Sequence, residues 1–182
     1  MSITKQRQQS AYLALAETFG YTSSMQSPRV MKVVVSSGVG KKRDKKQLEI
    51  IEDRLARITG QKPSARPAKI SIASFKVREG DTVGLQVTSR GARMFDFLDK
   101  IIHIALPRTR DFRGISPKAI DDMGNITIGI REHTIFPETS DEDLKDVFGF
   151  AVTIVTTAKS RAEAEAFFRH LGMPLRSEIV AR

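Results

Sequence analysis

Apolar residues recur three or four positions apart in four stretches of the chain, and this spacing predicts helices. Each stretch is bounded by residues that start or stop a helix, such as glycine and proline. The expected helices cover residues 5–19, residues 44–59 with Gly60 as the cap, residues 94–105 ended by Pro107, and a last segment opened by the capping box of Ser160 and Glu163 and closed by Gly172 and Pro174.

Between these stretches, β-branched residues run continuously or alternate with polar ones, which is typical of strands. Residues 60–80 break both patterns with two prolines and several basic residues, which predicts a short strand followed by an exposed loop. The interleaved order predicts an α+β fold with a mostly antiparallel sheet, in a single domain over residues 1–182. The other expected strands are 30–35, the alternation of Val83, Leu85 and Val87, that of Ile126, Ile128 and Ile130, and 148–156.

Composition narrows the class of protein. The chain has 182 residues, 40% of them hydrophobic, which suits one compact domain and not a disordered chain. It has no cysteine, which excludes disulfides, thiolate zinc sites and cysteine nucleophiles and fits a reducing cytosol. The first twenty residues hold no long apolar run, so neither a signal peptide nor a membrane span is expected, and the localisation expected is cytoplasmic.

Charge is distributed unevenly along the chain. Through Lys118 there are 23 basic and 10 acidic residues, and the remainder holds 7 basic and 11 acidic. Such asymmetry suggests one surface that faces a polyanion and another that faces a different partner. Because Lys and Arg supply most non-specific affinity for nucleic acid, the charge alone favours a nucleic-acid partner over a merely basic soluble protein.

The residues give no support for catalysis or for a metal or cofactor. The three histidines, His103, His133 and His170, are far apart and lack metal-ligand spacing, and His103 is interpreted as a packed or rim residue of its helix. The segment SSGVGKK fails as a Walker loop because Val35 and Lys42 stand where glycine and Ser or Thr are needed. The acidic segment 139–146 lacks a calcium-binding pattern, and a solvated face is the favoured interpretation.

Seven strings occur in order along the chain: RVMKVVVSSGVG, ITGQKP, AKISIASFKVREG, VTSRGARMFDFLD, IALPRTRDFRGIS, GNITIGIREHTIFPE and VTIVTTAK…LGMPLR. With them the chain resembles the bacterial type of large-subunit ribosomal protein five over about residues 12–176. The resemblance implies a curved antiparallel sheet with helices packed on one side and no enzyme activity. It also implies five partners: 5S rRNA, 23S rRNA, peptidyl-site tRNA, other 5S rRNA-binding proteins and a small-subunit head protein.

The resemblance assigns residues to three contacts. Serine, threonine and glutamine hydrogen-bond to ribose, Lys and Arg meet phosphates, and glycine permits close approach. In the loop 69–80, Phe75 is either a stacking surface for tRNA or an anchor to the body of the protein. The implied residues are Arg29, Lys32, Ser36, Gly38, Gln61, Lys62, Thr88, Arg90 and Gly91 for 5S rRNA; Lys69, Phe75, Lys76 and Arg78 for tRNA; and Arg108, Arg110 and Arg113 for the region toward the subunit interface.

The chain departs from the family pattern in two places. Ser36 and Ser37 stand where the family usually has Asn and Met, and serine has a shorter reach and a single donor. Residues 177–182 extend past the usual end of the family and are expected to form a disordered tail.

The acidic residues beyond Lys118 need not contact RNA and are free to face a basic small-subunit protein.

Two other functions are weighed against the resemblance. A general RNA chaperone or basic DNA-binding module is disfavoured because the sequence has no helix-turn-helix, RRM aromatic signature or zinc finger. An enzyme acting on an acidic substrate is disfavoured because the catalytic residues are missing. Co-purification with large ribosomal subunits and 5S rRNA would separate the three.

Overall fold

The computed structural model describes residues 2–40, 45–110, 112–139 and 147–176. The chain divides into two compact units. The first unit consists of Met1–Val33, Arg90–Ile128 and Thr153–Arg182, and the second of Val34–Ser89 and Gly129–Val152. The expectation of a single domain over residues 1–182 stays a prediction.

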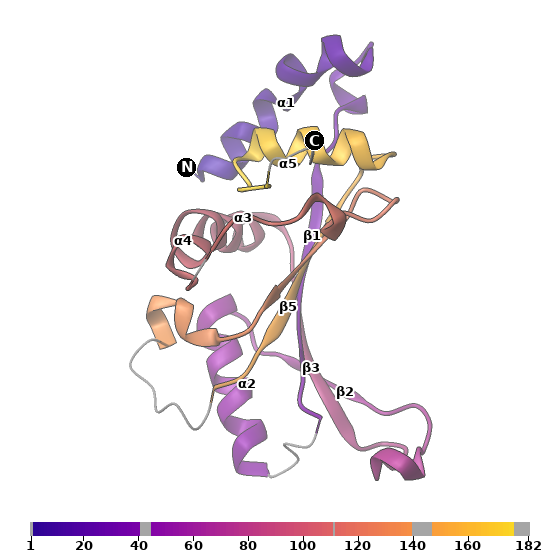
Figure 1. Cartoon of the computed structure of the whole chain (residues 1–182), viewed down its shortest axis with the longest axis vertical. Coiled ribbons are helices and arrows are strands. Elements are labelled where there is room, and N and C mark those ends of the chain that lie inside the picture. The colour runs from indigo at the N-terminus through magenta and orange to yellow at the C-terminus, as the bar shows by residue number, and fades with distance from the viewer. Residues whose placement is uncertain (1, 41–44, 111, 140–146, 177–182) are drawn as a thin grey trace, which may run out of the picture. The chain divides into compact units, whose positions relative to one another are not determined.

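Five strands form one sheet in the order β2-β3-β1-β5-β4. In β2 and β3, which are antiparallel, Ser64 lies opposite Gln86, and the register shifts between Arg66 and Pro67. The α+β class and the antiparallel sheet are therefore confirmed (Figure 1). The strands are β1 (Val30–Gly38), β2 (Ser64–Pro67), β3 (Thr82–Ser89), β4 (Ile126–Ile130) and β5 (Phe150–Thr156).

Burial alternates along the longer strands, so one face of each strand is buried and the other is open. Leu85, Val87 and Ser89 are buried in β3, and every second residue from Phe150 to Thr156 is buried in β5. This pattern fits the expected helices on one side. In β1 it explains why the strand extends past Val35: Ser37 continues the buried row, and Gly38 ends the strand.

In the first unit, α1 (Ile3–Phe19) packs against α5 (Arg161–Leu171) and α3 (Gly91–Lys100). The N-terminus of α1 is capped from α3, because Asp99 accepts hydrogen bonds from the backbone N–H groups of Ile3 and Thr4 at 3.0 and 2.9 Å and from the Thr4 hydroxyl. Burial would raise the pKa of Asp99, but these hydrogen bonds outweigh it and lower the pKa. Ser2 caps the same turn, which is why α1 begins at Ile3 and not at Lys5.

A side chain of α1 holds the C-terminus of α5. Arg7 donates to the carbonyl oxygen of Leu171 at 2.9 Å, which sets a cation at the C-terminus of α5. Gly172, at φ +90°, ends the helix as expected. At the start of α5, Ser160 accepts from the N–H of Glu163, whose carboxylate accepts from Lys159 and from the Tyr21 hydroxyl. Burial, together with the nearby carboxylate, raises the pKa of Tyr21 well above its usual value.

Pro107 does not end the helix after α3, and that prediction is wrong. A π-helical turn covers Ile101–Ala105, and a last α-helical turn, α4, covers Leu106–Arg108 with Pro107 inside it. Proline clashes with the preceding turn of a regular helix and lacks a donor; the wider π turn, in which the N–H of Leu106 bonds to Ile101, accommodates it. His103 is exposed there, so it is not a packed core residue.

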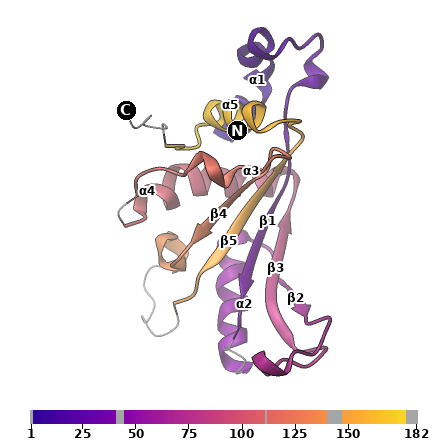
Figure 2. The same cartoon turned by 45° about the vertical axis from the view of Figure 1, so that its right-hand side comes forward.

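In the second unit, α2 (Lys45–Thr59) packs against β3 and ends at Gly60, whose φ of +68° confirms it as the cap (Figure 2). Ile51, Leu55 and Ile58 form its buried face. His133 is fully buried and stacks on Phe148 with the ring centroids 4.4 Å apart, which makes it a core residue. The short 3-10 segments of the chain are Ser24–Gln26, Ala73–Phe75, Pro117–Ala119, His133–Ile135 and Pro137–Thr139.

Two predictions lie outside the described residues: the polar acidic interruption over most of 139–146, and the tail 177–182. No helix among the residues described is both long and apolar enough to cross a membrane.

Candidate nucleic-acid interface

The open face of the strands in the second unit carries mostly small side chains, both polar and apolar. Ser36 and Thr88, both half-buried, point to this face because their neighbours Val35, Val87 and Ser89 fill the buried one. Where the side chains of this face are small, the backbone and hydroxyls of a ribose can approach closely. On β1, β3 and β5 of this unit the open face carries Val34, Ser36, Gly84, Gln86, Thr88 and Ala151. Arg66 of β2, opposite Gly84, adds a cation to the same face.

The two serines at the departure from the family pattern have different environments. Ser37 is buried, and its hydroxyl donates to the carbonyl oxygen of Gly149 at 2.8 Å. Ser36 lies on the open face. Of the pair, Ser36 is therefore the one that can offer a hydroxyl to a ligand.

Gly38, Gln61 and Lys62 lie at the ends of elements in the second unit. Gly38 is the exposed last residue of β1, and a Cβ there would meet nothing within 4 Å. Lys62, just beyond α2, is exposed but forms an ion pair with Glu52 at 3.3 Å. Gln61 is held at its carbonyl oxygen by the Thr59 hydroxyl, 3.1 Å away. Close approach of RNA thus has room at Gly38, while Lys62 would exchange its partner for a phosphate.

The remaining residues assigned to 5S rRNA belong to the first unit. Arg29 is exposed, and its backbone N–H and carbonyl both bond to Thr157 at 3.0 Å, which fixes the start of β1. Lys32 is half-buried. Arg90 and Gly91 open α3, where no side chain caps the first turn and Gly91 has φ +62°. An uncapped helix N-terminus beside an exposed arginine suits a phosphate.

The open face of this unit also carries residues that the sequence analysis missed. Thr127 of β4 and Thr153 of β5 lie opposite the buried rows, with their hydroxyls 3.1 Å apart. Their alternation with Ile126, Ile128, Val152 and Ile154 was visible in the sequence. This alternation predicts the strands, but it does not tell which of their two faces would contact a ligand.

The loop between β2 and β3 closes on itself, and most of its residues are exposed. Lys69, Lys76 and Arg78 are exposed, and Phe75 is 71% exposed, which disfavours its interpretation as an anchor to the body of the protein. Lys76 is the one non-glycine residue with positive φ among those described, at +52°. The tip of the loop therefore presents an aromatic ring between basic side chains.

The three arginines of the proposed bridge region follow the π turn. Arg108 ends α4, and Arg110 and Arg113 are exposed beyond it. The structure adds Arg176 to them, because the Arg176 Nε donates to the carbonyl oxygen of Arg113 at 3.3 Å. Because Arg176 follows Arg113 by 63 residues, no pattern in the sequence indicated that the two are neighbours.

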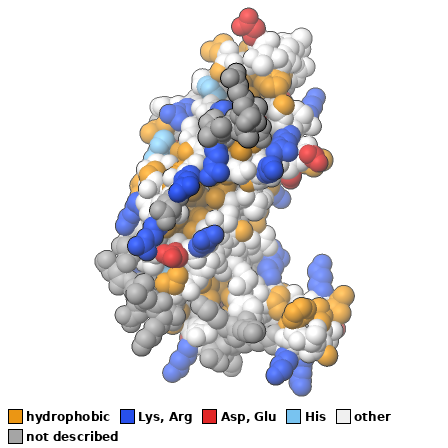
Figure 3. All heavy atoms as spheres, in the orientation of Figure 1, with side chains coloured by type: hydrophobic (Ala, Val, Ile, Leu, Met, Phe, Trp, Pro, Cys, Tyr) orange, Lys and Arg blue, Asp and Glu red, His pale blue; other side chains and the backbone are white. Residues whose placement is uncertain are grey.

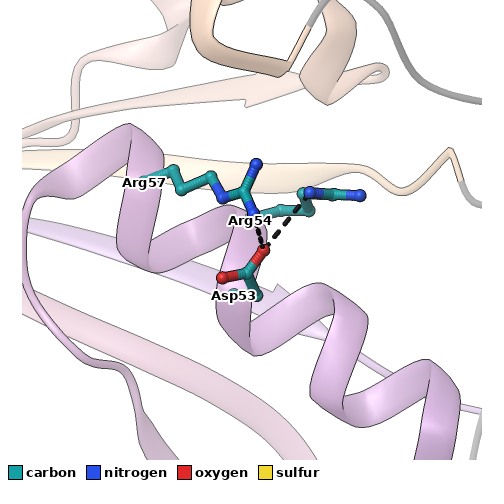
Figure 4. A network of polar contacts seen from close by, with 3 residues as sticks. All are labelled: Asp53, Arg54 and Arg57. Atoms are coloured by element: carbon teal, nitrogen blue, oxygen red, sulfur yellow. Dashed lines mark hydrogen bonds and ion pairs between the residues drawn. The ribbon is translucent and has the colours of Figure 1, made fainter.

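The acidic residues that the structure describes do not indicate a separate binding site. On α2, Asp53 accepts from Arg54 at 3.2 Å and from Arg57 at 2.9 Å, so these two arginines already have an acidic partner on their own helix (Figure 4). Among the described residues there is also no group of three or more His, Asp or Glu side chains arranged to hold a metal ion.

Basic side chains far outnumber acidic ones on the surface that Figure 3 shows. Open strand faces with small polar residues, exposed arginines at element ends and a net charge of +9 define a nucleic-acid-binding α+β protein.

Comparison with known proteins narrows this class to one family. The family model of ribosomal protein L5 matches residues 23–78, and the model of the C-terminus of the same ribosomal family matches residues 82–175. Large ribosomal subunit protein uL5 of Rubrobacter xylanophilus is 51% identical over 164 residues, covering 90% of this chain and 91% of the relative. The same protein of Heliobacterium modesticaldum is 49% identical over 166 residues, covering 91% and 92%, and that of Anaeromyxobacter sp. strain K is 47% identical over 163 residues, covering 89% and 91%. The chain belongs to the ribosomal protein L5 family, a structural protein family of the large ribosomal subunit, and its place is the ribosome in the bacterial cytoplasm.

Proposed function

We propose that the chain binds 5S rRNA and helps to attach it in the central protuberance of the large subunit. In this proposal it also contacts 23S rRNA, other 5S rRNA-binding proteins and the peptidyl-site tRNA, and it bridges to a protein of the small-subunit head. It acts as a structural RNA-binding protein, not as an enzyme. The observation that carries the 5S contact is the open strand face with Ser36 and Thr88, whose hydroxyls suit ribose and phosphate oxygens.

The contacts divide among the residues by their chemistry. Hydroxyl and amide side chains hydrogen-bond to RNA, basic residues meet phosphates, and Gly91 permits the turn into α3 beside the backbone of the RNA. The loop around Phe75 is the proposed tRNA contact, since an exposed ring between cations can stack and neutralise at once. The 5S contact comprises Arg29, Lys32, Ser36, Gly38, Gln61, Lys62, Thr88, Arg90 and Gly91; the tRNA contact Lys69, Phe75, Lys76 and Arg78; and the bridge region Arg108, Arg110 and Arg113.

A titration of the isolated protein with 5S rRNA tests the first contact. If about five phosphates are neutralised, log affinity falls with log salt at a slope of about −3.5 to −4.5. Equal affinity for an unrelated tRNA would favour a general RNA chaperone, and a slope near zero would contradict phosphate binding.

A pair of variants links the titration to the open face. Removing two hydroxyls with Ser36→Ala and Thr88→Ala is expected to weaken 5S binding about tenfold, at roughly 0.5–1.5 kcal/mol for each hydrogen bond. Thr18→Ala is the matched control, because Thr18 is exposed on α1. Unchanged affinity in the double variant would remove the open face from the 5S site.

A further inference from the structure

One side of α1 packs into the first unit, and the opposite side is open. Thr4, Ala11 and Leu15 are the buried residues of this helix. On the opposite side, exposed residues recur at every fourth position and so lie in one row along the helix. In the described part of the chain, no hydrogen bond or ion pair engages their side chains. These residues, which we call the outer row, are Lys5, Gln9, Leu13 and Glu17.

The outer row lies in a part of the chain that is poorly suited to RNA. Residues 8–28 form the longest stretch of the sequence without a lysine or an arginine, the residues that supply affinity for phosphate. Leu13, 81% exposed, and Met25, 85% exposed, are the two most exposed large hydrophobic residues among those described. Exposed apolar residues among few charges are typical of a surface that meets a protein.

The two charged residues of the outer row stand at the unfavourable ends of their own helix. Lys5 lies in the first turn of α1 and Glu17 in the last, and neither turn holds a charge of the opposite sign. A helix macrodipole favours anions at the N-terminus and cations at the C-terminus. Asp99 caps the first turn but forms no ion pair with Lys5. Beside a second helix that runs in the opposite direction, both charges would stand at its favourable ends.

A second copy of α1 in antiparallel orientation gives every member of the outer row a partner. With a two-fold axis at the level of Ala11, Lys5 of each copy lies beside Glu17 of the other, and Gln9 beside Leu13. The two Leu13 side chains then lie about 6 Å apart along the helix axes, four residues at a rise of about 1.5 Å each. The outer row is therefore complementary to itself in charge and places its apolar residue near the axis.

We propose that two copies of the chain associate through antiparallel contact of their outer rows. Over most of its surface a chain with a net charge of +9 brings like charges together, whereas this contact pairs opposite charges. The face of one helix is smaller than a standard interface, so the association is weak and reversible. The inference goes beyond the proposed function, because it needs no RNA and uses none of the residues proposed for RNA or for the subunit bridge.

Analytical ultracentrifugation of the full chain without RNA, over a range of concentrations, measures the association. Two-fold symmetry makes each substitution act twice. Glu17→Lys and Lys5→Glu each bring like charges together, so each should weaken the dimer about tenfold. The double variant Lys5→Glu/Glu17→Lys restores opposite charges and should return close to the parent. A role of these residues within one copy would not produce this restoration.

Two further variants separate the pairing from net charge and from apolar contact. Asp122→Lys is the matched control, because Asp122 is exposed in the same unit outside α1 and the substitution changes the net charge as Glu17→Lys does. Its dimer constant should stay near that of the parent. Leu13→Lys puts cations near the axis and should weaken the dimer at least about tenfold. Circular dichroism of each variant checks that the helix content is kept.

Several results would overturn the proposal. One is a parent that stays monomeric at every concentration; a photo-crosslinker at position 13 on assembled ribosomes would then assign the outer row to the protein or RNA that it reaches. Another is equal weakening by Asp122→Lys and Glu17→Lys, or a double variant as weak as the single ones. Binding of 5S rRNA by the same variants is measured separately, so the proposed function can fail while the dimer stands, and the reverse.

Discussion

Two regions of the molecule are both basic and exposed but are held together differently: the loop between β2 and β3, and the arginine corner, where the Nε of Arg176 donates to the carbonyl oxygen of Arg113. The loop is tied to itself: the N–H of Ala68 donates to the carbonyl oxygen of Asp81, the N–H of Gly80 donates to that of Ala68, and Ile72 pairs with Val77. The arginine corner joins residues about sixty positions apart through backbone pairing over a buried isoleucine. One region is a local hairpin end, and the other depends on the fold of the whole unit.

This difference in closure has consequences for the stability and the conformational freedom of each region. A locally closed loop contributes little to the core and can change conformation against a partner without loosening the rest of the unit. A region closed over a long stretch of chain has already lost its conformational entropy in folding, so it presents its cations in one arrangement. The loop is thus suited to an adaptable contact and the corner to a fixed one.

Two glycines with the same backbone angle give the largest expected contrast. Gly114 and Gly80 have φ of +88° and +89°, but only Gly114 faces backbone atoms that a Cβ would meet. Gly114→Ala should lower the free energy of unfolding by about 2–4 kcal/mol, from backbone strain together with overpacking, and Gly80→Ala by about 1–2 kcal/mol from strain alone. Urea unfolding of the isolated protein measures both. Equal losses would mean that the corner is no more tightly built than the loop.

The cap that Asp99 gives to α1 is another long-range closure of the first unit, and its loss should cost less. Asp99→Asn is expected to lower the free energy of unfolding by about 1 kcal/mol, because the amide NH2 cannot accept the hydrogen bond that one of the two carboxylate oxygens accepts. Because folding lowers the pKa of Asp99, its contribution is present above the unfolded value near 3.9 and is lost as the pH falls through the lower folded pKa. The gap between parent and variant should therefore close in acid. A gap that is constant from pH 7 to pH 2 would mean that the charge of Asp99 is not what matters.

The smallest effect on stability is expected in the loop. Replacing Lys69, Lys76 and Arg78 with Ala should change the free energy of unfolding by under about 1 kcal/mol in total, since all three are exposed and alanine has the same Cβ as lysine at the positive φ of residue 76. Affinity for 5S rRNA should survive, while the off-rate of peptidyl-site tRNA from ribosomes carrying the variant should rise. A collapse of 5S affinity with an unchanged tRNA off-rate would assign the loop to the 5S surface instead.

The contrast between local and distant closure also separates what the sequence could predict from what it could not. The alternation in β3 and β4 and the glycine at the end of α2 are local signals, and the structure confirms the elements that they predict. Pro107 was misread because a proline is a local stop signal, whereas the π turn that accommodates it appears only in the folded helix. Sequence reasoning is reliable here as far as one turn or one strand reaches.

For the candidate site, residue types were predictable and neighbours were not. The resemblance named Ser36 and Thr88, and strand alternation shows why both lie on the open face. Arg176 was read as the end of the matched family pattern, and no periodicity connects it with Arg113. Likewise, the pattern around Ser36 and Ser37 did not reveal that one hydroxyl is already used by Gly149. Long-range pairing decides these roles, and a single sequence does not display it.

The small side chains of the open strand faces also matter before the chain meets any RNA. Of the large apolar residues that are exposed in the described part of the chain, Met31 alone belongs to a strand of the sheet. The open sheet face of a newly made copy therefore gives other copies little apolar surface to bind, whereas a broad apolar sheet face would drive self-association. We therefore expect copies that have not yet met their RNA partner to avoid self-association through this face.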